Sequence, residues 1–180
     1  MKRRTIVQTS LAAGLVAGMV AFGLREDDTP LPGKDVPWRQ IAWPFPRDAW
    51  LPGLAWRRGT LEVYVRPKIG FCGNCDTGVV TDDEVDRVTD VDLLDERFAP
   101  ARDGLAVRIG ALSGRARLYR HTVIGGGTRH AEGIAVSQRC DLVIAVIVGN
   151  LLDERERTAA YRHLESSLVQ SWISQQLEGR

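Results

Sequence analysis

The sequence has little net charge and lacks the long basic block that marks a nucleic-acid-binding protein. Its 180 residues carry 24 lysines and arginines against 23 aspartates and glutamates, a formal net charge of +1. Charges of both signs are interspersed along the chain, as on an ordinary soluble surface. We therefore expect no nucleic-acid partner.

Catalytic signatures are missing as well. The chain has no Gly-x-Ser-x-Gly elbow, no His-Glu-x-x-His pair and no two carboxylates whose spacing singles them out. The acidic stretch at residues 82–96 lacks the glycine and terminal glutamate of an EF-hand loop, so it is interpreted as a solvated helix face. These absences favour a non-catalytic protein, and they leave open a site assembled from distant residues.

A hydrophobic run long enough to span a bilayer comfortably is also absent. The apolar stretch at residues 11–24 has 14 residues, whereas a spanning helix needs about 20. It follows three basic residues, and a basic end before a short apolar segment is typical of an export signal or a membrane anchor. The best cleavage-like site is Ala21-Phe22-Gly23, and cleavage and retention both stay open. Residues 1–28 are therefore predicted to be an export signal or a single-pass anchor.

Residues 2–8, KRRTIVQ, resemble a twin-arginine export signal. They keep the two arginines, Arg3 and Arg4, and the apolar pair that follows, but have Lys2 for the usual serine or threonine and Gln8 for the usual lysine. The resemblance implies delivery to the bacterial periplasm or to the periplasmic face of the inner membrane. It also implies membrane contact through the N-terminal segment if that segment is not cleaved.

Residues 29–59 form a segment, called the arm below, that is rich in proline and tryptophan. Its six prolines exclude helix and interior strand and predict an extended conformation. A flexible spacer would not contain four tryptophans, namely Trp38, Trp43, Trp50 and Trp56. Either the arm wraps along the domain and buries the indoles, or the rings lie at the membrane interface or anchor a partner protein.

Residues 60–180 are predicted to form a single domain of the α+β class. Alternating apolar residues indicate a strand at 61–65, ended by Pro67, and residues 81–84 have the spacing of a helix capping box. Strands are expected at 105–112 and 115–123, joined at Ser113-Gly114, and then at 133–137 and 142–148. A long amphipathic helix should follow Asn150. This order predicts a mainly antiparallel sheet of about five strands, with a helix after the first strand and one long C-terminal helix.

The chemically unusual spot is Cys72-Gly73-Asn74-Cys75, which holds two of the three cysteines. In an oxidising compartment such thiols close a disulfide or cycle between redox states. A redox enzyme is disfavoured, because residues 76–80 suit a helix poorly and Asp76 opposes the thiolate. We expect a structural disulfide, either Cys72 with Cys75 or one of these two with Cys140.

Metal binding is the alternative at this spot. Zinc or copper would need more ligands than Cys72 and Cys75, and the candidates are Cys140, His121 and His130. Otherwise no cofactor is expected.

Two functions follow from these patterns. The leading hypothesis is a non-catalytic accessory or assembly protein at the periplasmic face of the inner membrane. It would contact a larger membrane or periplasmic complex through the arm and one face of the domain. The alternative is a thiol–disulfide or metal-binding protein centred on Cys72 and Cys75.

Overall fold

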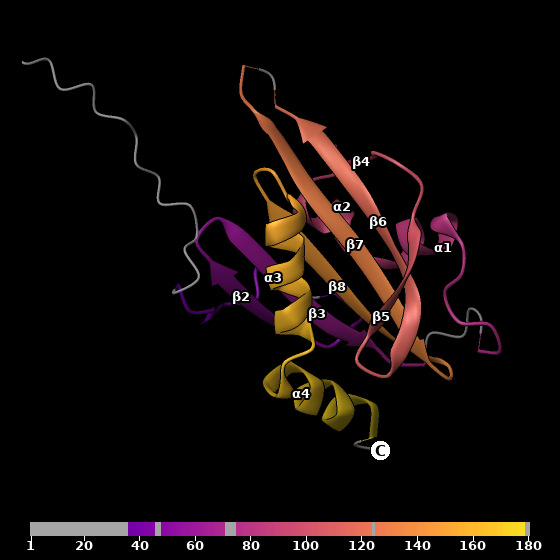
Figure 1. Ribbon diagram of the computed structural model, residues 1–180. Coiled ribbons are helices and arrows are strands. Elements are labelled where there is room, and N and C mark those ends of the chain that lie inside the picture. Colours follow the sequence, from indigo (N-terminus) through magenta and orange to yellow (C-terminus); the bar gives the residue numbers. More distant parts are fainter. Residues whose placement is uncertain (1–35, 46–47, 71–74, 124, 179–180) are drawn as a thin grey trace, which may run out of the picture. The chain divides into compact units, whose positions relative to one another are not determined.

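The structure is a computed structural model that describes residues 36–45, 48–70, 75–123 and 125–178. The strands are β1 (Arg39–Ile41), β2 (Leu54–Arg58), β3 (Leu61–Lys68), β4 (Ala99–Pro100), β5 (Leu105–Ile109), β6 (Leu112–Thr122), β7 (Thr128–Gln138) and β8 (Asp141–Gly149). The helices are α1 (Asp82–Val88), α2 (Val91–Leu94), α3 (Glu154–Leu164) and α4 (Ser167–Glu178). Within the described residues, these eight strands form one antiparallel sheet in the order β1-β2-β3-β8-β7-β6-β4, and β5 pairs with β6 (Figure 1).

The predicted layout of about five strands and one long C-terminal helix is wrong. The arm supplies two of the additional strands: β1 lies between Pro37 and Pro44, and β2 begins after Pro52. The prolines therefore lie outside these two strands, where they limit strand length but do not prevent strand formation. Strand β3 also continues through Pro67, which is opposite Val143 of β8. On the other edge of β3, the pairing with β2 ends at Val65. The missing N–H of Pro67 therefore removes no backbone hydrogen bond to β2.

The turn between β5 and β6 lies at Gly110-Ala111, not at the expected Ser113-Gly114. Gly110 has a φ of 59°, which glycine adopts without strain at the first position of a two-residue turn. Gly114 instead stands inside β6, where a Cβ atom would come within 2.0 Å of the carbonyl oxygen of Ala135. It is a glycine because the neighbouring backbone is close, not because the chain turns there.

The expected long C-terminal helix is broken into α3 and α4 at Glu165 and Ser166. The hydroxyl of Ser166 donates a hydrogen bond of 2.6 Å to the carbonyl of His163 at the end of α3. The two helices run in different directions (Figure 1), and the break changes the buried face. Leu168 lies four residues after Leu164 and would share its buried face in one continuous helix, yet it is 64% exposed, whereas Val169 is buried.

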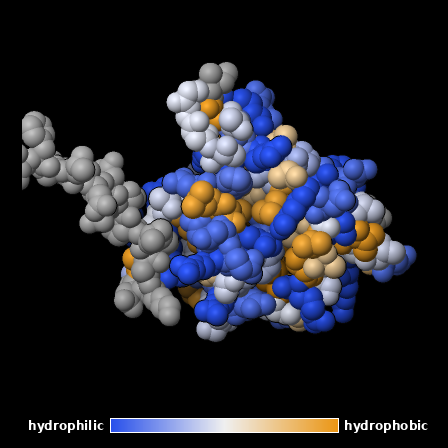
Figure 2. All heavy atoms as spheres, turned by 45° about the horizontal axis from the view of Figure 1, so that its top comes forward, coloured by the Kyte–Doolittle hydropathy of each residue, from blue (hydrophilic) through white to orange (hydrophobic). Residues whose placement is uncertain are grey.

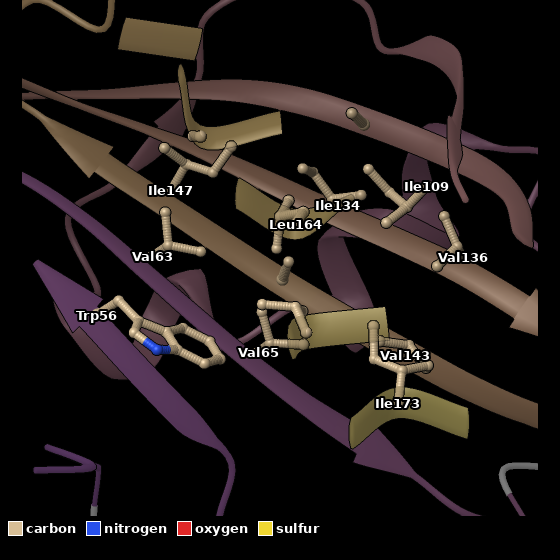
Figure 3. Close-up of a cluster of buried hydrophobic side chains, with 14 of the residues drawn as sticks. Trp56, Val63, Val65, Ile109, Ile134, Val136, Val143, Ile147, Leu164 and Ile173 are labelled. Atoms are coloured by element: carbon tan, nitrogen blue, oxygen red, sulfur yellow. The ribbon is translucent and has the colours of Figure 1, made fainter. Parts of the chain in front are cut away.

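The two faces of the sheet pack against different elements. One face packs against α3 and α4, in a core that includes Trp56, Val65, Ile134, Leu164 and Ile173 (Figure 3). The other face packs against the part of the arm between β1 and β2, which includes Trp43 and Phe45, and against α1 and α2. The buried residues on this face are Phe45, Ala55, Tyr64, Val79, Val85, Val88, Val91, Tyr119, Ala131, Ala135, Leu142, Ile144, Val146 and Val148. Strand β8 contributes to both cores, which explains why its sequence is continuously apolar.

Helix α1 begins with the predicted capping box: Thr81 accepts from the N–H of Glu84, and Glu84 accepts from the N–H of Thr81. Its acidic side chains do not all face solvent. Asp82 and Asp86 pair with Arg115 and Arg117 of β6, so part of the acidic stretch fixes α1 to the sheet.

A cluster of charged side chains lies buried beneath the arm. Arg66 of β3 is 1% exposed and donates to both carboxylate oxygens of Asp48, at 3.0 and 2.8 Å, and to Asp90, at 2.8 Å. Lys68 lies 3.1 Å from Asp90 and donates to the carbonyl of Val88. The Arg66 guanidinium holds the pKa of the Asp48 carboxyl below its usual range. These charges join the arm, the sheet and the α1–α2 segment.

Replacing Asp90 with asparagine should therefore lower the free energy of unfolding by about 3 to 5 kcal/mol, because two buried cations lose their shared carboxylate. Chemical denaturation of the full chain measures this loss. The matched control is Arg57→Ala, which removes the ion pair between Arg57 and Glu62. Because the Arg57 side chain is exposed, this substitution should lower the free energy of unfolding by about 1 kcal/mol or less. Equal effects of the two substitutions would contradict the role given to the cluster.

Candidate functional site

A disulfide is present, and it joins Cys75 to Cys140 across 65 positions of sequence. Of the two predicted pairings, the one between Cys72 and Cys75 is therefore wrong, because Cys75 is already bonded to Cys140. Cys140 lies in the turn between β7 and β8, and Cys75 lies between β3 and α1. The bond therefore ties the loop before α1 to the end of the β7–β8 hairpin. Cys72, the other candidate for pairing, lies outside the described residues.

The two candidate histidine ligands are not close to this disulfide. His130 is opposite Gly149, at the far end of the same β7–β8 hairpin that carries Cys140 in its turn. His121 of β6 is buried, and its Nδ1 lies 3.4 Å from Asp95. No group of three or more metal-ligating side chains occurs among the residues that the structure describes.

The four tryptophans of the arm all contact the domain itself. Trp56 is buried in the core, and Trp38 stacks on His163 with 4.4 Å between ring centroids. Trp43 packs on Phe45 and on Tyr64, and Trp50 lies over the ammonium group of Lys68. These contacts are those expected of an arm that wraps along the domain. An additional role of the rings in binding a partner stays a prediction.

His163 lies between two of these indoles. Its ring is stacked on Trp38, and Trp56 meets it edge-on at 4.8 Å. Burial of the ring lowers the pKa of His163 from 6.5 to about 4. The imidazole is therefore neutral at physiological pH and behaves as part of the core.

A groove of about 420 Å³ lies between α3 and the β5–β6 edge of the sheet. Its apolar lining comes from the two strands: Leu105, Ala106, Val107, Ala116 and Leu118. Its polar lining comes from α3 and its C-cap Glu165, from Glu132 of β7 and from the segment before β5: Arg102, Asp103, Glu132, Glu154, Arg157, Thr158, Tyr161, Arg162 and Glu165. The space-filling view shows small apolar patches among hydrophilic side chains (Figure 2). We call this cavity the α3–β5 groove.

One end of the α3–β5 groove is formed by an irregularity in the sheet edge. Pro100 is opposite Tyr119 and Leu105 is opposite Ala116, so four residues, 101–104, span the length that two residues cover on β6. Such a bulge bends the strand and redirects side chains, and bulges are frequent beside functional sites. Here it brings Arg102 and Asp103 to the groove.

A buried ion pair fixes α3 along the groove. Glu132 is 2% exposed and accepts two hydrogen bonds from Arg157, at 2.9 and 2.7 Å, and one from the hydroxyl of Tyr161 at 3.1 Å. Burial, together with the Glu132 carboxylate, raises the pKa of Tyr161 above its ordinary value. The phenol therefore remains protonated and donates to Glu132 at neutral pH.

Four further charged side chains at the groove have no hydrogen bond or ion pair within the described part of the chain: Arg102, Asp103, Arg162 and Glu165. Each wall thus carries one free positive and one free negative charge. Unpaired charges around an apolar floor are typical of a binding surface with a polar rim. The same side chains offer no base-activated nucleophile.

The pattern of the sequence does not predict the α3–β5 groove. Glu132 was the available signal, because it interrupts an otherwise small and apolar segment at residues 131–136. Arg157 and Tyr161 are four residues apart and therefore share one helix face. Linking them to Glu132 requires the position of α3 over the sheet, which no spacing in the sequence gives.

Neither a protein-family model nor a curated protein matches this chain. In the part that the structure describes, no helix is long and apolar enough to cross a membrane. The segment with Arg3 and Arg4 lies outside the described residues, so the export signal stays a prediction.

The disulfide should contribute about 4 kcal/mol to the free energy of unfolding, the value expected when a bond closes a loop of this length in the unfolded chain. The Cys75→Ser/Cys140→Ser variant should show that loss in chemical denaturation. Cys72→Ser is the matched control, because it leaves the Cys75–Cys140 bond in place. A loss of stability in Cys72→Ser as large as in the double variant would argue against this pairing.

Because of His163, the free energy of unfolding should also decrease as the pH is lowered. Its pKa is lower in the folded chain, at about 4, than its ordinary 6.5, so the unfolded chain takes up the proton first. Stability is fully present above pH 6.5 and is lost as pH falls through that window. His163→Phe should lack this part of the pH dependence in denaturant unfolding, and the curves for the two proteins should be parallel above pH 7. Parallel curves between pH 6.5 and 4 would refute the assignment.

Proposed function

We propose that this chain is an exported, non-catalytic accessory protein that binds another protein through the α3–β5 groove. The observation that carries the proposal is the groove's composition: an apolar floor beside four charged side chains without a partner in the described residues. Leaving charged groups unpaired gains nothing for folding, whereas charges at the rim of an interface guide and orient a partner.

The proposed location is the bacterial periplasm or the periplasmic face of the inner membrane. The Cys75–Cys140 disulfide supports an oxidising compartment, because such bonds persist outside the cytosol and are rare within it. The basic and apolar N-terminus, with its resemblance to a twin-arginine signal, supports export of a folded protein. A signal retained as an anchor would keep the domain beside a membrane-bound complex.

A protein partner fits the groove better than a small ligand does. Sites for small molecules surround most of the ligand and direct a few polar groups to one point. In this groove the free charges are divided between α3 and the segment before β5. That division suits a partner that extends across the whole groove.

The test places a photoreactive amino acid at one of two exposed leucines in cells that produce the full chain. Leu105 is 57% exposed and borders the groove, whereas Leu93 is 38% exposed on α2, which packs on the opposite face of the sheet. We expect a discrete crosslinked partner from position 105 and none from position 93. The Arg162→Glu/Glu165→Lys exchange should weaken that crosslink, because it reverses both free charges on the helical wall of the groove.

Crosslinks of equal strength at the two positions, or none at position 105, would exclude the groove as the binding site. A crosslink at position 105 that ignores the charge exchange would remove the role of Arg162 and Glu165. The Trp38→Ala/Trp43→Ala/Trp50→Ala variant, checked for folding, reports separately on the arm as a contact surface.

A further inference from the structure

Strand β5 is an edge strand with open backbone groups. It pairs only with β6 in the described structure. Its hairpin with β6 has two turn residues, and the closing pair of such a hairpin, Ile109 with Leu112, exchanges backbone hydrogen bonds. Backbone groups that face β6 alternate along β5 with groups that face away from it. Those that bond to β6 belong to Leu105, Val107 and Ile109. The N–H and C=O groups of Ala106 and Arg108 therefore point away from the sheet.

The other edge strands of the described sheet are protected, and β5 is not. Strand β1 has three residues and stands between Pro37 and Pro44, and β4 contains Pro100. Short length and proline are the usual ways in which proteins block pairing at an edge. Strand β5 has five residues, no proline and one charge, Arg108. Among the edge strands of the described residues, β5 alone therefore lacks these two protections against pairing.

The side chains of β5 connect this open edge to the groove. Leu105 and Val107 line the groove, and they are opposite Ala116 and Gly114 of β6. A strand added beside β5 would place every second side chain on this same face of the sheet. Those side chains would extend the apolar floor formed by Leu105 and Val107, with α3 as the opposing wall.

We propose that the partner docks by adding an extended segment to β5, so that the segment becomes an additional strand beside the α3–β5 groove. The inference rests on the proposed function and specifies the chemistry of the partner. Backbone groups of Ala106 and Arg108 bind the segment's main chain, and alternate apolar side chains of the segment face the groove. Charged residues of both signs at its ends meet Arg102 and Asp103 on one wall and Arg162 and Glu165 on the other.

The probe is a displayed library of random short peptides, selected on the full chain with its disulfide intact. Selected peptides should have apolar residues at alternate positions. Their binding should slow amide hydrogen exchange at Ala106 and Arg108, the two residues whose N–H groups point outward. This measurement uses the unaltered chain, so it does not depend on how a variant folds.

The matched variants are Ala106→Pro and Ala106→Thr. Proline removes one outward donor and blocks the approach of a strand while keeping the bonds to β6, so affinity should fall about tenfold or more. Threonine keeps the N–H and suits a strand, so affinity should change little. Equal affinities for the two variants would overturn the inference.

Three other results would also overturn it. These are the selection of no peptide, binding without protection of Ala106 and Arg108, and protection that appears when the chain alone is concentrated, which would indicate pairing with a second copy. Crosslinking from position 105 that persists in Ala106→Pro would show a partner in the groove that is not an added strand. In that case the proposed function would stand and this inference would fail.

Discussion

The arrangement of the domain depends on the neutralisation of Arg66 and Lys68. Both cations belong to β3 and lie on the face of the sheet that packs against the arm, α1 and α2. A buried cation is strongly unfavourable unless it is paired. Their carboxylate partners come from Asp48 in the arm and Asp90 between α1 and α2. One ion cluster therefore requires that three separate segments meet on the same face of the sheet, and the apolar core on that face can close only when they do.

The opposite face has a corresponding constraint, the pairing of Glu132 with Arg157. This pair fixes α3 above β7, while β5 and β6 extend the sheet beyond the helix. The floor beside α3 is left uncovered, and that uncovered floor is the groove. The buried pair is thus structural in the first place, and the groove follows from where it holds the helix.

Local signals in the sequence predicted local structure well: the capping box at Thr81 and the β7–β8 hairpin are both present. The disulfide was predicted without its pairing, because the spacing of the cysteines left Cys72 and Cys140 both possible as partners of Cys75. The wrong predictions concern features that depend on tertiary contacts. Residues of the arm form β1 and β2 because β3 provides an edge on which the sheet continues. Gly114 is required by the close approach of a neighbouring backbone. The break after α3 was missed because the apolar spacing continues across it. The groove was missed because its residues come from three strands, a bulge and a helix.

The tryptophans and the groove differ in what binding would cost the domain. Trp38, Trp43 and Trp50 already stack on His163, Tyr64 and Lys68 or lie beside them, so presenting these rings to a partner would break internal contacts. The free charges of the groove and the outward backbone groups of β5 break none when they bind. A partner that uses the groove gains its contacts without unfolding the arm, and this asymmetry favours the groove as the contact surface.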